Sequence, residues 1–388
     1  MDSELPWVTF ALIGVMLAFA AGWIGSRLDI RQWKREQSDS PKAYYKGLNL
    51  LLNEQQDKAI DAFIEAMQQD PGTAELHFAL GNLFRRRGEY ERAVRVHEYL
   101  LARSDLPEAD RHRARHGLAQ DFMKAGLFDR AEAAFRELDG TAFATDARLE
   151  LLNLYERTRD WRAAIDSARK LEAAGAGSFA TRIAHHWCEI AEEADARQRP
   201  DEADAALAEA RAVAPQAPRP LILAGQRLAA AGRHAEALAL WNELFALQPG
   251  AVSLVAAEYA ASALAAGDPA AARERLAALQ ARQPSSDTLA ALLGLEPDAA
   301  ARSTRLQQAL KQQPTLSTAA ALLKENAATA DPGDKTQAEQ LAQVVGARAK
   351  PQQRYRCAAC GFEAQHYFWQ CPGCQTWDSY PPVRLDDQ

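Results

Sequence analysis

Small and large apolar residues recur through the middle of the chain at intervals of about 34 residues. The first unit carries Gly47, Ala59, Phe63, Ala66 and Pro71. The markers of six further units are Gly81 and Ala93; Leu118, Phe122, Gly126, Phe128, Ala131 and Phe135; Leu151, Tyr155, Trp161, Ala164 and Leu171; Trp187, Ile190, Ala203, Leu207, Ala210 and Pro215; Gly225, Gly232, Ala237, Trp241 and Pro249; and Gly267, Ala272, Leu276, Leu279 and Pro284. A degenerate eighth unit ends at Ala309 and Pro314 and has a shortened first helix. This self-similarity predicts a repeat architecture.

Within each unit the spacing predicts a helix hairpin. Glycine and alanine let two helices approach closely, large side chains fill the seam between units, and proline ends the second helix. One hairpin cannot bury its own apolar face, so we predict an all-α, right-handed solenoid with a concave groove. The order of residues resembles the 34-residue tetratricopeptide repeat, whose groove holds a peptide or a partner's helix. An ordinary amphipathic helix pair explains one unit, but not seven in series.

Residues 5–26 form an apolar run without a charged side chain. At 1.5 Å per residue the run makes a helix of about 33 Å, which can cross a hydrocarbon core of about 30 Å. Trp7 and Trp23 lie near its ends, where aromatic rings favour the headgroup region. The run therefore predicts a single transmembrane anchor.

The charges beside this run favour an uncleaved anchor with the rest of the chain in the cytoplasm. Asp2 and Glu4 precede the run, where a signal peptide would carry Lys or Arg, although Ala18-Phe19-Ala20 resembles a cleavage site. The following flank carries Arg27, Arg31, Lys34 and Arg35. Basic residues beside a span tend to remain in the cytoplasm, so we predict a single-pass protein of the inner membrane. A cleaved signal peptide and a buried core helix are the alternatives.

Four of the five cysteines lie within 18 residues near the C-terminus, as two Cys-x-x-Cys pairs made by Cys357, Cys360, Cys371 and Cys374. In such tight turns backbone N–H groups point back at the sulfurs, and Gly361 and Gly373 suit the left-handed conformations that the turns need. Four thiolates in tetrahedral geometry select zinc or a single iron ion. About thirty residues cannot build a sufficient core, so we predict that metal is required for this segment to fold.

The predicted cytoplasmic side favours metal binding, because a reducing compartment keeps clustered thiols free. Two disulfide bonds and free structural thiols are the alternatives. The aromatic residues of the cysteine segment are predicted to form its small core: Tyr355, Phe362, Tyr367, Phe368, Trp369, Trp377 and Tyr380.

Composition and motifs exclude other classes. Of 388 residues, 25% are charged and 48% hydrophobic, which is ordinary for a globular protein, and the net charge of −7 gives no reason to expect nucleic acid. The chain contains no GxxxxGK[ST], GxSxG, GxGxxG after a strand or HExxH motif, so we predict no enzyme. His185, His186 and Cys188 are close in sequence, but they point to different faces of a helix and are predicted to be packing or surface positions.

Basic residues are concentrated between Gly81 and His116. The arginines of this stretch are Arg85, Arg86, Arg87, Arg92, Arg95, Arg103, Arg111, Arg113 and Arg115. Six acidic residues lie among them, so the local excess is modest. The stretch follows the predicted anchor and would meet anionic headgroups or an acidic partner. Solvated helix faces explain it as well.

The cysteine segment and the order of the parts resemble one family. YRCAACGF and CPGC resemble the two knuckles of rubredoxin, although much of a full rubredoxin is missing. An anchor, repeats containing NEQQDKAIDAF and LGNLFRRRGEYERA, and a C-terminal knuckle together resemble the lipopolysaccharide assembly protein B family of Gram-negative bacteria. The resemblance covers essentially the whole chain and is weakest between about residues 256 and 330.

This resemblance implies an inner-membrane adapter that faces the cytoplasm. Such proteins bring the deacetylase that commits carbon to lipid A to a membrane-bound AAA+ zinc protease, which degrades it. A membrane protein that senses lipopolysaccharide restrains them through the anchor, and the metal knuckle packs against the repeats. A general tetratricopeptide scaffold for envelope enzymes and a rubredoxin-type electron carrier are the alternatives, and a homodimer is left open.

We therefore expect five segments. They are an anchor at 1–26, a juxtamembrane linker at 27–42, a solenoid at 43–314, a helical segment and linker at 315–350, and a rubredoxin-like domain at 351–388. Cys357, Cys360, Cys371 and Cys374 would bind one iron or zinc ion.

Overall fold

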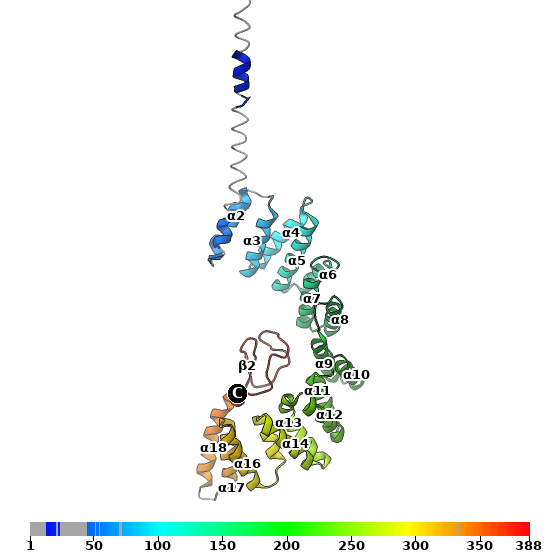
Figure 1. Cartoon of the computed structure of the whole chain (residues 1–388), viewed down its shortest axis with the longest axis vertical. Helices are drawn as coiled ribbons and strands as arrows, with labels where there is room; N and C mark the ends of the chain where they lie inside the picture. Colours follow the sequence, from blue (N-terminus) through cyan, green and yellow to red (C-terminus); the bar gives the residue numbers. More distant parts are fainter. Residues whose placement is uncertain are drawn as a thin grey trace, which may run out of the picture. The chain divides into compact units, whose positions relative to one another are not determined.

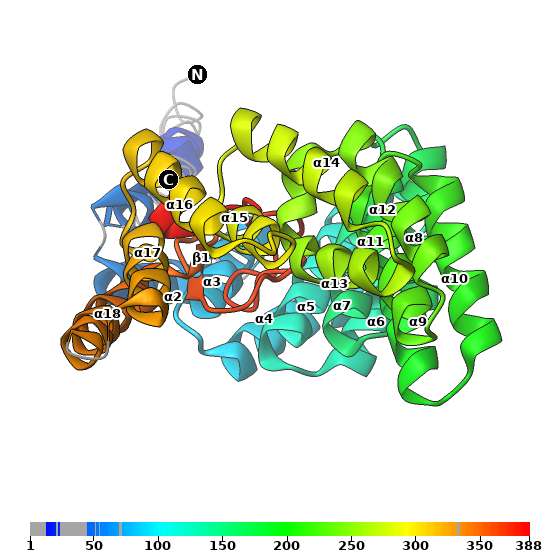
Figure 2. The same cartoon turned by 90° about the horizontal axis from the view of Figure 1, so that it is seen from below.

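A computed structural model describes residues 13–20, 22–23, 45–50, 52–53, 55–69, 72–331 and 334–388. It divides into two compact units, Met1–Thr158 and Arg159–Gln388. Nearly all of the described chain is helical, apart from a short segment near the C-terminus that contains the four clustered cysteines (Figures 1 and 2).

The predicted anchor lies largely outside the described residues. Residues 13–20 and 22–23 are helical, whereas the rest of the apolar run, its charged flanks and the linker at 27–42 are not described, and neither is Pro71. In the part of the chain that the structure describes, no helix combines the length and apolar character needed to cross a bilayer.

The first unit is a series of helices in which each packs against the next along the chain. After a short helical stretch at 45–50, its helices are α2 (Gln56–Gln69), α3 (Ala74–Arg86), α4 (Tyr90–Ala102), α5 (Glu108–Ala125), α6 (Phe128–Arg136) and α7 (Ala144–Thr158). Gly126 ends α5 in the left-handed conformation, with φ of 77°, which lets the chain reverse into α6.

The second unit continues the same pattern and then adds the cysteine segment. Its helices are α8 (Trp161–Ala173), α9 (Ala180–Ala196), α10 (Pro200–Val213), α11 (Pro218–Ala230), α12 (His234–Leu247), η1 (Pro249–Leu254), α13 (Ala256–Ala266), α14 (Pro269–Arg282), α15 (Ser286–Gly294), α16 (Ala299–Gln312), α17 (Leu316–Thr329) and α18 (Lys335–Ala349). The nine-residue α15 is the shortened first helix that the sequence predicts for the eighth unit. Helices α17 and α18 pack together as one further hairpin after Pro314.

The alanine marker of each of the seven regular repeats is buried, as the hairpin spacing requires. The set comprises Ala59, Ala93, Ala131, Ala164, Ala203, Ala237 and Ala272, and none is more than 3% exposed. A methyl group is the largest side chain that lets the two helices of a hairpin approach this closely. The burial of these seven alanines therefore confirms the predicted series of tetratricopeptide-type helix hairpins.

Gly225 shows how closely the helices of one repeat approach. A Cβ atom at this position would lie 2.3 Å from Nε1 of Trp241, whose side chain is fully buried. We expect Gly225→Ala to destabilise the second unit by about 1–3 kcal/mol, because the indole has no space into which to move. Urea denaturation followed by tryptophan fluorescence measures the change.

Gly346→Ala in α18 is the matched control, because a Cβ there meets nothing within 4 Å. We expect it to be neutral or to stabilise by up to about 1 kcal/mol, since alanine loses less backbone entropy than glycine in a helix. Equal effects of the two substitutions would contradict the packing described.

Candidate metal centre

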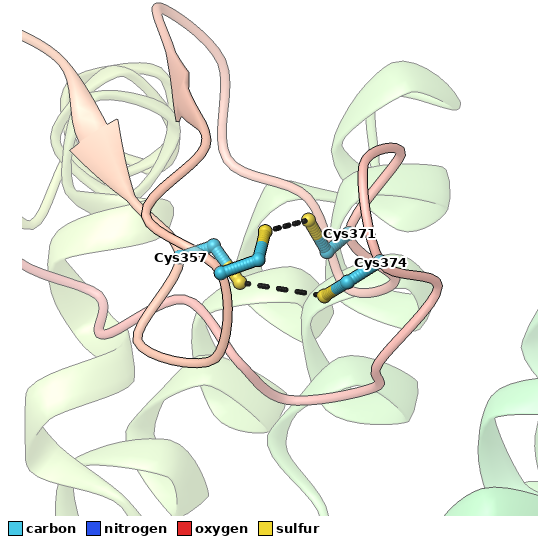
Figure 3. Close-up of side chains that lie close together, drawn as sticks. Cys357, Cys371 and Cys374 are labelled. Atoms are coloured by element: carbon cyan, nitrogen blue, oxygen red, sulfur yellow. Dashed lines mark hydrogen bonds between the residues drawn. The ribbon is translucent and has the colours of Figure 1, made fainter. Parts of the chain in front are cut away.

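Two tight turns bring the four predicted sulfurs together. The first turn joins β1 (Tyr355–Arg356) to β2 (Glu363–Ala364), which pair as a short antiparallel hairpin, and it carries Cys357 and Cys360. The second turn carries Cys371 and Cys374 (Figure 3). All four sulfur atoms lie within 4.8 Å of one another.

The sulfur separations fit a tetrahedral metal ion. Sγ of Cys357 lies 3.8 Å from Sγ of Cys374, and Sγ of Cys360 lies 3.7 Å from Sγ of Cys371. A tetrahedron with metal–sulfur bonds of about 2.3 Å has edges of about 3.8 Å. Two of the six sulfur–sulfur distances therefore match those of a zinc or iron site, and the others are within 4.8 Å.

Polar groups around the turns stabilise thiolates. Burial raises the pKa of Cys357, but its hydrogen bond with Ser379 Oγ and those from the N–H groups of Cys360 and Ala359 outweigh it and lower the pKa to about 6. The side chain and N–H of Thr376 lower the pKa of Cys374. These N–H groups confirm the prediction that the turns point their backbone donors at the sulfurs.

The thiol of Cys360 shows why this arrangement favours a cation. The N–H of Phe362 lowers the pKa of Cys360, but removal from water and the three neighbouring thiols raise it, to about 12 in total. Four negative charges cannot gather at this separation without compensation. A divalent ion at the centre supplies that compensation and lets all four sulfurs ionise.

The prediction for the second turn is wrong in one residue. Gly361 has φ of 78°, as predicted, whereas Gly373 does not adopt a positive φ. The left-handed residue of the second turn is Gln375, with φ of 60°. Gly361 and Gln375 each directly follow the second cysteine of their pair, so the two turns are equivalent. Gly373 is small for another reason, because a Cβ there would lie only 3.3 Å from the ring of Phe362.

The predicted aromatic core is also only partly correct. Tyr355 and Tyr380 are buried with Cys357 and Cys371, and Tyr367 packs against them. Phe362 and Phe368 are 44% and 37% exposed. The remaining two aromatic residues, Trp369 and Trp377, face the helical repeats. The segment is too small to enclose seven large rings, so it uses two of them to bind the repeats.

Trp377 and Asp378 dock the cysteine segment onto α9. The ring of Trp377 stacks on His185 with centroids 4.7 Å apart and planes 14° apart, and it meets Trp161 edge-on. Oδ2 of Asp378 lies 2.9 Å from Nε2 of His185, whose side chain is 2% exposed. His185, His186 and Cys188 are all buried, so the predicted packing role is confirmed, and for His185 the packing partner is the metal-binding segment.

Arg219 completes this interface from the start of α11. Its side chain is only 3% exposed, donates to Glu189 over 2.7 Å and to Glu192 over 2.9 Å, and lies 5.8 Å from the ring centroid of Trp369. A buried guanidinium needs such carboxylate partners to offset its desolvation. Burial also raises the pKa of the adjacent Cys188 to about 12, so this fifth thiol stays protonated and unreactive.

The sequence contains the polar residues of this interface, but it does not show which residues they contact. His185 on α9 and Arg219 on α11 are buried polar residues. A buried polar residue on a repeat indicates a polar partner, but nothing in the local sequence identifies Asp378, which lies 193 residues away.

The basic stretch of the first unit is mostly neutralised by ion pairs. Within the described part of this unit seven of its nine arginines pair with carboxylates, as Arg85–Asp121, Arg87–Glu89, Arg92–Glu89, Arg95–Glu91, Arg103–Asp105, Arg113–Glu75 and Arg115–Glu137. His97 is fully buried, with Nδ1 2.6 Å from Asp121. This pairing favours the interpretation as solvated and packed helix faces over a headgroup-binding surface.

Comparisons with known proteins agree with both parts of the structure. Residues 355–381 match the family model of the rubredoxin metal binding domain, and residues 46–109 match that of the tetratricopeptide repeat. Lipopolysaccharide assembly protein B of Escherichia coli (strain K12) is 32% identical over 381 residues, which cover 97% of each chain. The protein of the same name from Haemophilus influenzae is 28% identical over 388 residues, covering 95% of this chain and 96% of the other.

Among solved structures, that of PilW, a type IV pilus biogenesis factor, is similar at 17% identity and a TM-score of 0.33, covering 56% of this chain and 97% of the other.

The fold and the site define a tetratricopeptide-repeat protein with a C-terminal rubredoxin-type metal-binding domain. By its match along nearly the whole length of the Escherichia coli protein, the chain belongs to the lipopolysaccharide assembly protein B family.

Proposed function

We propose that this protein acts in lipopolysaccharide assembly as a membrane-tethered adapter. The observation that carries the proposal is the similarity to lipopolysaccharide assembly protein B of Escherichia coli over 97% of both chains. Because that similarity extends through the repeats and the cysteine segment alike, the function is expected to depend on both.

The adapter would bring two proteins together on the cytoplasmic face of the inner membrane. One is the deacetylase that commits carbon to lipid A, and the other is a membrane-bound AAA+ zinc protease that degrades it. A membrane protein that senses lipopolysaccharide would restrain the adapter through its anchor. Stacked helix hairpins suit this role, because their extended surface binds peptides and partner helices.

The metal would serve structure and not catalysis. Four cysteines fill the tetrahedral coordination of zinc or iron and leave no position for water or substrate, which is the arrangement of a closed structural site. We propose that Cys357, Cys360, Cys371 and Cys374 bind one such ion. The ion would hold the two turns together, so that Trp369 and Trp377 keep their positions against the repeats.

Residues 5–26 would anchor the chain, because tethering raises the local concentration of partners in the same membrane. With the cytoplasmic orientation favoured by Arg27, Arg31, Lys34 and Arg35, a reporter active only in the periplasm stays silent when fused after Gln388. A chain that starts at Pro41 is expected to regulate lipopolysaccharide synthesis poorly at equal abundance. Full regulation by that chain, or a strong periplasmic signal, would contradict the anchor as proposed.

The test of the adapter is depletion of this protein followed by measurement of the deacetylase half-life. We expect the half-life to lengthen severalfold and lipopolysaccharide synthesis to rise, and re-expression of the full chain to reverse both. Retention of protease and deacetylase together on the immobilised full chain should accompany this. An unchanged half-life with defective lipopolysaccharide assembly would instead support a general scaffold for assembly enzymes.

A further inference from the structure

We propose that the last repeats contain a binding site for a segment of the form Arg-x-Asp-Asp, and that the chain's own residues 382–387 occupy it as a strap. In this structure the strap contacts η1, α15 and α17 of the second unit. The inference does not depend on the proposed function.

The two aspartates of the strap bind the starts of two different helices. Oδ2 of Asp387 accepts hydrogen bonds from the N–H and Oγ of Ser286, over 2.9 and 2.8 Å, at the first residue of α15. Oδ2 of Asp386 accepts from the N–H of Ser317 over 2.7 Å in the first turn of α17. Carboxylates are stabilised there by free N–H donors and by the positive end of the helix dipole.

The helices keep these donors available because their own caps use others. Ser285 caps α15 by accepting from the N–H of Thr288, and Thr315 caps α17 by accepting from the N–H of Thr318. Residues 283–288 and 313–318 share the order Gln-Pro-Ser/Thr-x-x-Thr, thirty residues apart. The same sequence at the start of a helix thus occurs in two successive repeats, and each of these helix starts binds one carboxylate.

Further contacts fix the direction and the sequence of the bound segment. Nε and Nη2 of Arg384 donate to the carboxylate of Asp287 over 2.7 and 2.9 Å, a two-pronged pairing that lysine cannot reproduce. Oγ of Ser253 donates to the carbonyl of Pro382 over 2.7 Å, and Nε2 of Gln313 donates to the carbonyl of Asp387 over 2.8 Å. The site therefore recognises one cation followed, two residues later, by a pair of carboxylates.

Two consequences follow from this geometry. The strap fastens the end of the metal-binding segment to α15 and α17, so its release would loosen that segment from the repeats. The vacated site would then fit a partner that exposes an Arg-x-Asp-Asp stretch. No covalent bond holds the strap, so a partner of this chemistry can compete with it.

The test uses the full chain and a chain that ends at Pro382, with a fluorescently labelled peptide VRLDDQ as the probe. We expect the shortened chain to bind VRLDDQ at least tenfold more tightly than it binds VRLNNQ, and at least tenfold more tightly than the full chain binds VRLDDQ. Equal binding of the two peptides, or equal binding by the two chains, would overturn the proposal. So would the absence of binding by a shortened chain that keeps its metal and helical content.

A second variant covers the case in which the shortened chain does not fold. The full-length double variant Asp386→Asn with Asp387→Asn keeps the chain length but weakens the strap. It is compared with Asp166→Asn combined with Glu274→Gln, which removes the same charge at two exposed positions of the second unit. We expect the first variant to bind VRLDDQ and to be cleaved by trypsin after Arg354 severalfold faster than the control. If the two variants behave alike, the strap is not a ligand of this site.

Discussion

Cys371→Ser is expected to abolish metal binding and to release residues 355–381 from the repeats of the second unit. Sγ of Cys371 is fully buried and lies 3.7 Å from Sγ of Cys360, so the serine oxygen would replace an interior ligand. A structural zinc site contributes on the order of 10 kcal/mol or more to folding, and losing one of four thiolates removes much of it. Elemental analysis should find less than a tenth of the metal of the unchanged protein.

We expect loss of the metal to destabilise the repeats of the second unit but not those of the first unit. A solenoid transmits stability mainly between neighbours, which on its own predicts that all repeats survive. Here, however, His185 on α9, Arg219 on α11 and Ser286 on α15 each contact the segment that carries the cysteines or its C-terminal strap. We therefore expect amide hydrogen exchange to accelerate in these helices and to remain unchanged in α3 to α7.

Cys188→Ser is the matched control, because this fifth thiol is equally buried but lies outside the cluster of four. It should retain the metal. Full metal content in Cys371→Ser, or unchanged exchange in α9 and α15, would refute a structural role for the site. If the adapter function depends on the docked segment, Cys371→Ser should also raise lipopolysaccharide synthesis to the level seen on depletion.

Trp377→Ala is expected to detach the metal-binding segment while leaving the metal in place. The indole stacks on His185 and meets Trp161 and His186 edge-on, and none of these contacts involves a cysteine. Truncating a large buried aromatic side chain costs about 3–5 kcal/mol, and we expect about 3 kcal/mol here because Trp377 is half-buried. The free energy of unfolding of the second unit, measured in urea at saturating metal, should fall by that amount.

Phe362→Ala provides the comparison within the same segment. The residue is 44% exposed and its ring lies beside Gly373 of the second turn, so we expect a loss below about 1 kcal/mol. Metal content should match the unchanged protein in both variants. If Trp377→Ala lost its metal as well, the docking contact and the metal site would be one structural unit and not two.

The local and periodic features of this protein could be predicted from its sequence. Alanines at the marker positions, from Ala59 to Ala272, are all buried where the hairpin spacing places them, because helix packing depends on residues a few positions apart. Cys357, Cys360, Cys371 and Cys374 converge because each pair is already close within its own turn. The left-handed residue of the second turn was predicted at Gly373 and lies at Gln375, since the equivalence of the two turns outweighs the preference of glycine.

The sequence by itself thus determined the helical repeats and the convergence of four cysteines, which rest on contacts within about forty residues. Only the tertiary structure decided which surfaces meet. Asp378 lies 193 residues from His185, and Asp387 lies 101 residues from Ser286. Hydrogen bonds and ion pairs depend on positions in space and carry no periodic signal along the chain. The folded chain is therefore needed to show that the metal-binding segment, with its strap, is built into the second unit.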